Sequence, residues 1–529
     1  MSERERSSSR SRVARVGALL ACASLASFAA AQEAASPARA FCIRGATLVD
    51  GSGSPARRGD LLVREGRIVA LGEVDDVAAR GAESIEAEGL VLAPGFVDVH
   101  AHGDAFEHAR FEGFLAQGVT TIALGLDGGS PRLPEEAERY AAGEFGPNLV
   151  LFAGHATLRT TAGCGLRSDL GAEDLARLSA AVEAALAAGA VGLSLGLEYD
   201  AGRASSMDEL VTCAKPLAAR DAFVACHLRS EDDAAIASAL QELLSIGRAS
   251  GARVHVSHLK VVLGRGEERA TEVLALLDAA RAQGQRVSAD LYPYTASYTG
   301  IDLLFPAWAR PPHSYGAALH ERRAELLAHL KERVNARNGP AATLLGSGKW
   351  KGKTLEELAR ELERPFEEVL AEDLPPGSAS AAYFVMDERA MRRFLRDPEV
   401  MIASDGGPSL AHPRGYGSQA RVLRLALDGE AGFTLEEAVR KLASLPAATL
   451  RLRERGVLRV GARADLVLFD PQRVRDRASF EEPRRLAEGV RATWVNGVLA
   501  YEEGHANDAR AGCWLRATDA LEFSLPAGR

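Results

Sequence analysis

The sequence predicts an α/β protein built on a closed (β/α)8 barrel, and the order of its apolar runs leads to that prediction. Eight short apolar runs recur along the middle of the chain, and helical patterns separate most of them. Strands that alternate with helices are typical of parallel βαβ units, and eight such units close into a barrel. The predicted strands are 96–102, 120–125, 148–154, 190–196, 223–229, 253–260, 286–294 and 399–407.

The intervening segments carry helix signals. Ser206 with Glu209, and Thr434 with Glu437, fit the capping-box pattern of a helix start. Segments such as 173–188 are rich in Ala and Leu at helical spacing. These helices are expected to cover the outside of the barrel.

Short strands broken by turns flank the barrel on both sides. They predict an accessory β-sandwich domain made from both chain ends, residues 41–94 and 453–515, beside a barrel of residues 95–452. The long link 301–398 contains two further helical patterns. We interpret it as an insertion after strand seven that lies over the barrel mouth, and a separate small domain is the alternative.

The first 31 residues differ from the rest of the chain. Arg10, Arg12 and Arg15 precede an apolar run over residues 16–31, which ends in alanines before Gln32. This pattern predicts a signal peptide, residues 1–31, and a secreted or periplasmic protein, since the run is too short to span a bilayer. A disordered tail is one alternative, and lipid attachment at Cys22 is another.

Charge and composition argue against several classes of partner. The 529 residues carry a net charge of -9, so the basic footprint of a nucleic-acid-binding protein is missing. No later segment predicts a membrane span. There is no C-x-x-C pair and no heptad array, so the sequence predicts neither a zinc ribbon nor a particular oligomeric state.

Two histidines at the end of the first barrel strand are the strongest chemical signal. His100 and His102 are two residues apart, and residues at that spacing on a strand face the same way. We therefore expect both to point into the barrel, where they could share one metal ion. A surface pair is the alternative, and the apolar neighbours argue against it.

Single histidines end two consecutive strands further along. The two-residue period places His227 on the same face as Ala225, and His258 on the same face as Val254 and Val256. A lone strand-end histidine is more often structural, but two at the carboxyl ends of barrel strands favour a metal site. Imidazole nitrogens suit zinc.

Asp405 ends the eighth predicted strand and precedes Gly406 and Gly407. The two-residue period places it on one face with Met401 and Ala403. A carboxylate beside a metal ion can take a proton from water and pass it to a leaving amine, which makes Asp405 the candidate catalytic residue. A turn or helix-cap aspartate is the alternative.

Together these residues resemble the amidohydrolase superfamily, in which strand one carries His-x-His, strands five and six carry single histidines and strand eight carries an aspartate. The resemblance covers nearly the whole chain after the leader. Six further motifs resemble the D-aminoacylase branch, the N-acyl-D-amino-acid deacylases. They are 154–159 (GHATLR), 192–199 (GLSLGLEY), 227–231 (HLRSE), 257–260 (SHLK), 290–295 (DLYPYT) and 412–416 (HPRGY).

The resemblance implies a metal site and a substrate site. It implies Zn2+, as one or two divalent ions, held by His100, His102, His227, His258 and Asp405. It also implies a group that holds the substrate's α-carboxylate, which we call the carboxylate clamp: Lys260, Tyr292 and Arg414. An ammonium, a phenol and a guanidinium can all donate hydrogen bonds to one carboxylate.

One departure from the branch concerns the metal site. D-aminoacylases carry a bridging cysteine in a Gly-Asn-Cys-Gly motif after strand two, where this chain has Asp127 before Gly128. A carboxylate can also bridge two ions and is a harder ligand than thiolate, so we interpret Asp127 as a metal ligand rather than a turn aspartate. Glu198 is the second candidate for a bridging or supporting carboxylate. His155 is either a supporting donor or a packed core histidine.

A second departure concerns the substrate side chain. Acidic-substrate members of the branch carry an extra arginine downstream of the Tyr-Pro-Tyr motif, where this chain has Asp-Leu-Leu-Phe-Pro at 302–306. The sequence therefore predicts neutral or apolar side chains.

The predicted activity is cleavage of small N-acyl-D-amino acids to a carboxylate and a free D-amino acid by an exported, metal-dependent hydrolase. A dipeptidase or cyclic amidase on the same scaffold is the first rival, and it would need no carboxylate clamp. A non-catalytic binding protein is the second rival, and the full ligand set with Asp405 argues against it.

Overall fold

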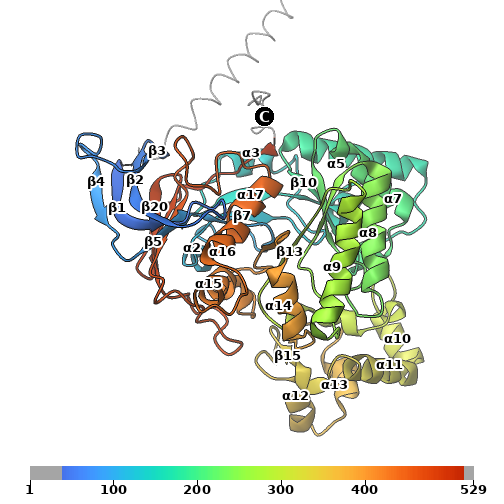
Figure 1. The fold of residues 1–529 in the computed structure, drawn as a ribbon. Coiled ribbons are helices and arrows are strands. Elements are labelled where there is room, and N and C mark those ends of the chain that lie inside the picture. The colour runs from blue at the N-terminus through green and yellow to red at the C-terminus, as the bar shows by residue number, and fades with distance from the viewer. Residues whose placement is uncertain (1–38, 518–529) are drawn as a thin grey trace, which may run out of the picture.

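The computed structural model describes residues 39–517 and confirms the predicted fold class, an α/β barrel with a small β domain. Figure 1 shows the barrel in the middle, the β domain with its blue strands on one side, and the yellow insertion projecting from the barrel. The predicted signal peptide, residues 1–31, lies outside the described residues. Within the described range no helix is both long enough and apolar enough to cross a bilayer.

Eight barrel strands occupy the eight predicted runs, and each pair of neighbours is parallel. An isolated bridge between Ala101 and Gly406, beyond the ends of the first and last strands, completes the ring. The strands are β6 (Phe96–Asp98), β7 (Val119–Leu124), β8 (Asn148–Leu151) with its continuation β9 (Ala153–Gly154), β10 (Gly192–Gly196), β11 (Phe223–His227), β12 (Arg253–Val256), β13 (Val287–Leu291) and β17 (Val400–Ile402).

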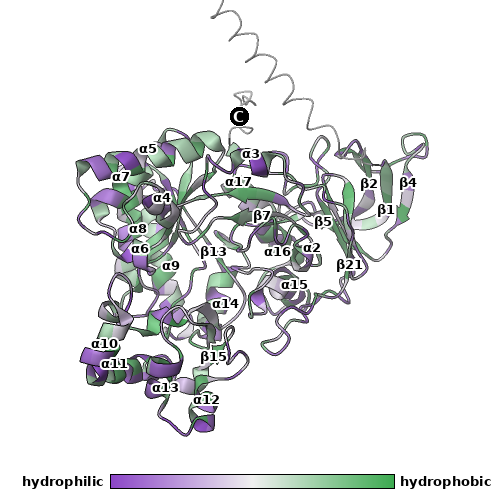
Figure 2. Cartoon of the chain, turned by 180° about the vertical axis from the view of Figure 1, so that it is seen from behind, coloured by the Kyte–Doolittle hydropathy of each residue, from purple (hydrophilic) through white to green (hydrophobic). Residues whose placement is uncertain are grey.

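Helices cover the outside of the ring, and several alternate polar and apolar residues, as α5 and α7 do in Figure 2. Ser206 and Thr434 cap α7 and α16 as predicted, because each hydroxyl accepts a hydrogen bond from the backbone N–H three residues on. The helices are α2 (Glu112–Leu115), α3 (Ala137–Ala141), α4 (His155–Thr161), α5 (Ala172–Ala188), α6 (Asp200–Arg203), α7 (Met207–Ala218), α8 (Ile236–Ser250), α9 (Gly266–Ala282), α14 (Glu388–Arg396), α15 (Arg414–Leu427), α16 (Leu435–Leu442) and α17 (Ser444–Thr449).

Strands from both chain ends form one sheet in the β domain. β5 (Val91–Pro94) pairs antiparallel with β18 (Leu466–Phe469), which joins the two halves. β1 (Phe41–Leu48) forks the sheet, because its first half pairs with β4 (Glu83–Glu86) and its end pairs with β5. The remaining strands are β2 (Arg57–Arg64), β3 (Arg67–Gly72), β19 (Val490–Val495), β20 (Val498–Glu502) and β21 (His505–Ala506).

The insertion after β13 has its own three-stranded sheet and its own apolar core, around Leu330, Leu358 and Tyr383. Helix α14 packs into the main core beside α9 and leads into β17, so the insertion ends before it. The insertion's elements are β14 (Ser297–Gly300), α10 (Tyr315–Glu321), α11 (Arg323–Asn335), β15 (Thr343–Leu345), α12 (Leu355–Glu361), α13 (Phe366–Asp373) and β16 (Ser380–Tyr383), with three short 3-10 turns.

Candidate metal centre

Four histidines converge on Asp127, which lies in the loop after β7. The carboxylate oxygens of Asp127 lie 3.4 Å from His100 Nε2, 3.6 Å from His102 Nε2, 3.5 Å from His258 Nε2 and 3.9 Å from His227 Nδ1. The carboxyl ends of barrel strands, where active sites of this fold lie, therefore bring the predicted ligands together.

Two groups of possible ligands share Asp127, and within each group the ligand atoms lie within 4.8 Å of one another. We call the combined set the ligand cluster: His100, His102, Asp127 and Asp405 in one group, and Asp127, His227 and His258 in the other. Imidazole nitrogens with carboxylate oxygens suit zinc, and a carboxylate common to both groups stands where a bridging ligand would.

Buried atoms in the cluster show that these residues fit a cation. Both ring nitrogens of His100 and Oδ1 of Asp127 are buried and have no hydrogen-bond partner. Buried polar atoms are normally paired, and leaving one unpaired costs roughly 1–3 kcal/mol. A divalent ion between His100 Nε2 and Asp127 Oδ1 would satisfy two of these three atoms, while His100 Nδ1 faces Asp290.

The cluster also concentrates charge. Burial lowers the pKa of His100, but the carboxylates of Asp127, Asp290 and Asp405 together outweigh burial and raise that pKa well above its usual range. Burial raises the pKa of Asp127, whereas His100 and His258 together lower it well below its usual range. Because imidazole must be neutral to bind a metal, loading of the site is expected to release protons.

Three residues of the cluster have left-handed backbone conformations: Asp127 (φ 54°), His258 (φ 37°) and Asp405 (φ 48°). Such a conformation costs a non-glycine residue about 1–3 kcal/mol and persists where the surrounding structure enforces it. Each of the three follows the end of a barrel strand. The strained turns therefore direct these side chains toward the cluster.

The prediction that His258 shares a strand face with Val254 and Val256 was wrong. Both valines pack in the core between the barrel and its helices. Their neighbour His255 faces the barrel interior instead, with its ring centroid 5.9 Å from that of Phe223. Because β12 ends at Val256, the turn at His258 and not the strand period brings its imidazole inward.

The two-residue strand period agrees better with the orientation of the other ligands. Ala225, Met401 and Ala403 pack in the barrel interior, on the side from which His227 and Asp405 reach the cluster. His100 and His102 face the cluster together as predicted, although β6 ends two residues before His100.

Two glutamates contact His227 and His258 at the ring nitrogens that face away from Asp127. His227 Nε2 lies 3.0 Å from Glu198 Oε2, and His258 Nδ1 lies 3.0 Å from Glu231 Oε1. A carboxylate that accepts a proton from one ring nitrogen leaves the other nitrogen to bind a metal, and in both rings that other nitrogen faces Asp127. The Nδ1 of His258 also lies 2.8 Å from Lys260 Nζ, so Glu231 is shared between His258 and Lys260. The structure thus gives Glu198 a supporting position, although Glu198, His227 and Glu231 also lie close enough to hold an ion themselves.

Sequence reasoning missed three buried carboxylates around the cluster. Glu231 ends the HLRSE motif, which was a signal that could have found it. Asp290 accepts a hydrogen bond from the backbone N–H of His258 at 2.9 Å. Asp98 accepts from the N–H groups of His100 and Ser404, which ties the loop after β6 to the loop after β17, and burial raises the pKa of Asp98 to about 6.

The three residues of the carboxylate clamp lie beside the cluster. Arg414 Nη1 is 2.6 Å from Asp405 Oδ2, and its guanidinium carbon is 4.8 Å from the centroid of the Tyr292 ring. Lys260 Nζ is 2.7 Å from Glu231 Oε1 and 5.7 Å from the same ring centroid. Arg414 Nε is buried and has no hydrogen-bond partner, so it offers a donor to a ligand.

His155 makes its polar contacts away from the cluster. Its Nε2 lies 2.8 Å from Glu209 Oε1 of α7, and Arg159 of α4 pairs with the same carboxylate. In the part of the chain that the structure describes, His155 joins none of the groups that could hold a metal. These contacts match the packed-core alternative.

Comparisons with known proteins agree with this geometry. A family profile described as "Amidohydrolase family" matches residues 374–501. The chain is 36% identical to the N-acyl-D-aspartate deacylase of Alcaligenes xylosoxydans xylosoxydans, over 92% of this chain and 97% of that protein. It is 34% identical to the D-aminoacylase of the same organism, over 90% of this chain and 98% of that protein.

Solved structures give the same result. Two similar structures are a D-aminoacylase studied for its binuclear metal centre and the N-acyl-D-glutamate deacylase of Bordetella bronchiseptica in complex with zinc and a phosphonate inhibitor. Each has a TM-score of 0.76 and 33% identity, and covers 90% of this chain and 99% of its own.

The barrel gathers imidazoles and carboxylates at the carboxyl ends of its strands, and the similar proteins belong to the same class. This chain is therefore an amidohydrolase. Within that class, the chain belongs to the family of D-aminoacylases and N-acyl-D-amino-acid deacylases.

Proposed function

We propose that this chain is an exported, zinc-dependent N-acyl-D-amino-acid deacylase that prefers neutral or apolar side chains. The observation that carries the proposal is the meeting of four imidazoles at Asp127, beside the Asp405–Arg414 pair. The substrate would be a small N-acyl-D-amino acid, and the products a carboxylate and a free D-amino acid.

The proposed reaction assigns Asp405 the proton transfers. Zinc held by the ligand cluster would polarise the amide carbonyl. It would also lower the pKa of a water molecule, so that this water could act as a nucleophile at neutral pH. Asp405 is nearly buried, and its Oδ1 lies 3.0 Å from His102 Nε2, at the edge of that cluster. From there its carboxylate can accept a proton from the attacking water and deliver it to the leaving nitrogen.

Arg414 is the member of the carboxylate clamp with the clearest free donor. Its Nη1 and Nη2 are engaged by Asp405 and by the backbone carbonyl of Tyr298, but Nε is buried without a partner. A substrate carboxylate would supply that partner in a charge-assisted hydrogen bond. The clamp would therefore select substrates with a free α-carboxylate and disfavour cyclic amides.

A second candidate, cleavage of N-acyl-D-amino acids with acidic side chains, rests on Arg310 in the insertion. Arg310 is 8% exposed, and its Nε is buried without a hydrogen-bond partner. Burial and Arg203 lower the pKa of Arg310, and its Nη1 donates a hydrogen bond to the carbonyl oxygen of Asp302 at 3.0 Å. A relative that is 36% identical is named N-acyl-D-aspartate deacylase.

Amine release from a panel of N-acetyl-D- and N-acetyl-L-amino acids by the zinc-loaded protein tests the proposal. We expect hydrolysis of D forms only, fastest with leucine, valine or phenylalanine. Hydrolysis restricted to D-aspartate and D-glutamate derivatives, and lost in Arg310→Leu, would instead support the second candidate. No release by zinc-bound protein would contradict both.

The export part of the proposal rests on the leader pattern alone. Amino-terminal sequencing of the protein recovered outside the cytoplasm is expected to begin at Gln32. A full-length cytoplasmic protein would contradict export and leave the catalytic proposal untouched.

A further inference from the structure

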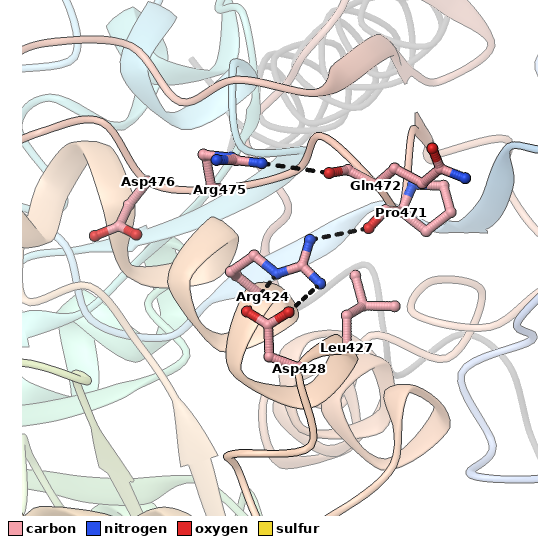
Figure 3. A pocket seen from close by; sticks show the side chains of 7 residues that line it. All are labelled: Arg424, Leu427, Asp428, Pro471, Gln472, Arg475 and Asp476. Atoms are coloured by element: carbon pink, nitrogen blue, oxygen red, sulfur yellow. Dashed lines mark hydrogen bonds and ion pairs between the residues drawn. The ribbon is translucent and has the colours of Figure 1, made fainter.

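A segment of the β domain reaches from its sheet to the substrate side of the barrel. It comprises residues 470–489, between β18 and β19, and we call it the strap. Its base is pinned, because Arg475 and Glu488 exchange two backbone hydrogen bonds. A hollow of about 720 Å³ lies between the base and the end of α15. In Figure 3, Arg424 and Asp428 line it from the side of the helix, and Gln472 and Arg475 line it from the side of the strap.

Beyond its base the strap is tied to the barrel at Asp476. Asp476 Oδ2 accepts hydrogen bonds from Tyr294 Oη and from Arg421 Nη1, both at 3.2 Å. A side chain at Gly417 would not fit there, because a Cβ atom would lie 2.2 Å from Tyr294 Oη and 2.8 Å from Asp476 Cβ. The strap is therefore held against the helix that Arg414 begins.

The tip of the strap meets the insertion over a buried histidine. The ring centroid of Phe480 lies 5.0 Å from that of His412 and 4.7 Å from that of Phe384, which follows β16. His412 is 1% exposed, and Phe480 is one of the residues that cover its ring.

His412 in turn contacts the carboxylate clamp. Its Nε2 lies 3.0 Å from the carbonyl oxygen of Ala296 and must donate there, which leaves Nδ1 to accept the backbone N–H of Arg414 at 3.0 Å. The same ring lies edge-on to Tyr292, at 6.1 Å between centroids, and to Tyr298, at 6.2 Å.

We infer that the strap is a positioning element for the carboxylate clamp, with Phe480 acting through His412. This rests on the proposed function, because it takes Arg414 and Tyr292 to hold the substrate's α-carboxylate. The ring of Phe480 packs against Phe384 and His412, which lie outside the ligand cluster, so its removal should weaken substrate binding without disturbing the metal or Asp405. The β domain would thereby contribute to recognition of a free carboxylate.

Phe480→Ala tests the inference, with Phe433→Ala as the matched control, since both phenylalanines are partly buried and Phe433 lies between α15 and α16. An aromatic edge contact is worth enough to predict about a three- to tenfold rise in KM for N-acetyl-D-leucine in Phe480→Ala, with kcat and zinc content nearly unchanged. Phe433→Ala should leave KM unchanged. An unchanged KM in folded Phe480→Ala would overturn the inference.

A double-variant cycle separates positioning from general loosening. If Phe480 acts through the clamp, Phe480→Ala should add little to the KM of Arg414→Lys, because the two changes affect one interaction. Fully additive effects would overturn the inference. Should Phe480→Ala fold poorly, Phe480→Leu keeps apolar volume without the ring edge and is expected to show a smaller KM rise of the same kind.

Amide hydrogen exchange distinguishes a failure of this inference from a failure of the proposed function. The Arg414 N–H bonds to His412, so a peptide covering 412–416 should exchange faster in Phe480→Ala than in wild type or Phe433→Ala. Unchanged exchange would overturn the inference whatever the substrate is. Faster exchange in a protein whose wild type hydrolyses no N-acyl-D-amino acid would contradict the proposed function alone.

Discussion

The ligand cluster and the carboxylate clamp are neighbours, but they are built in different ways. The ligands follow the ends of barrel strands, where parallel pairing fixes the backbone on both sides. Lys260 and Tyr292 of the clamp also follow barrel strands, but the clamp has contacts outside the barrel as well. Tyr292 Oη lies 3.8 Å from Met386 Sδ, and the Arg414 N–H bonds to His412, whose ring packs against Phe480 of the strap. The barrel therefore supplies the ligand cluster, while segments outside the barrel contribute to substrate recognition.

This difference predicts that changes in the cluster act on turnover and metal content, and that changes in the clamp act on substrate affinity. Single variants in each region test that division.

Asp405→Asn should give the largest loss of turnover. The amide keeps the size of the side chain but cannot transfer protons, so kcat should fall by about 10²–10⁴-fold. Zinc content should stay near that of wild type, because the imidazoles and Asp127 remain. Steady-state rates together with metal analysis check this, and wild-type turnover in the variant would exclude the proton-transfer role.

Asp127 should dominate metal binding. Asp127→Asn removes the charge shared by both ligand groups and should weaken zinc binding by more than the roughly 10–100-fold typical of residues behind the ligands. Asp127→Cys places a thiolate there and should restore zinc binding. Zinc titration of the three proteins decides the point, and unaltered affinity in Asp127→Asn would show that Asp127 is not a ligand.

Several parts of this arrangement could be predicted from the sequence. The eight apolar runs gave the barrel, and His100, His102, His227 and Asp405 follow from histidines and an aspartate at predicted strand ends. Asp127 was found because it stands where relatives carry a cysteine. These signals are local, so a single segment contains each of them.

The rest depends on contacts between distant segments. Asp98 bonds to Ser404 and Glu231 pairs with Lys260, and no local pattern shows that these distant residues meet. The face of His258 was mispredicted because the two-residue period applies only within β12, which ends before it. The strap could not be predicted from the sequence, because Phe480 contacts His412 only where the β domain meets the barrel.

Glu198→Gln tests whether the carboxylates behind the histidines support the metal. Loss of a carboxylate that orients His227 should weaken zinc binding by about 10–100-fold. Glu272→Gln, an exposed change on α9, serves as the control and should have no effect. An equal zinc affinity in both variants would remove Glu198 from the metal site.

Arg414→Lys should produce the smallest effect of the four and should fall on KM. The ammonium keeps the charge but loses the planar pair of donors, so KM for N-acetyl-D-leucine should rise by about tenfold, with a smaller change in kcat. Zinc affinity should not change. A fall in kcat as large as that of Asp405→Asn would instead place Arg414 in the chemistry through its contact with Asp405.

The most direct measurement is the rate of amine release from N-acetyl-D-leucine and from its L enantiomer as zinc is titrated into metal-free protein. We predict that activity toward the D form rises with bound zinc, disappears on chelation and is absent toward the L form. Zinc-bound protein that leaves the D form intact, or that hydrolyses both forms equally, would contradict the assignment of this site to D-amino-acid deacylation.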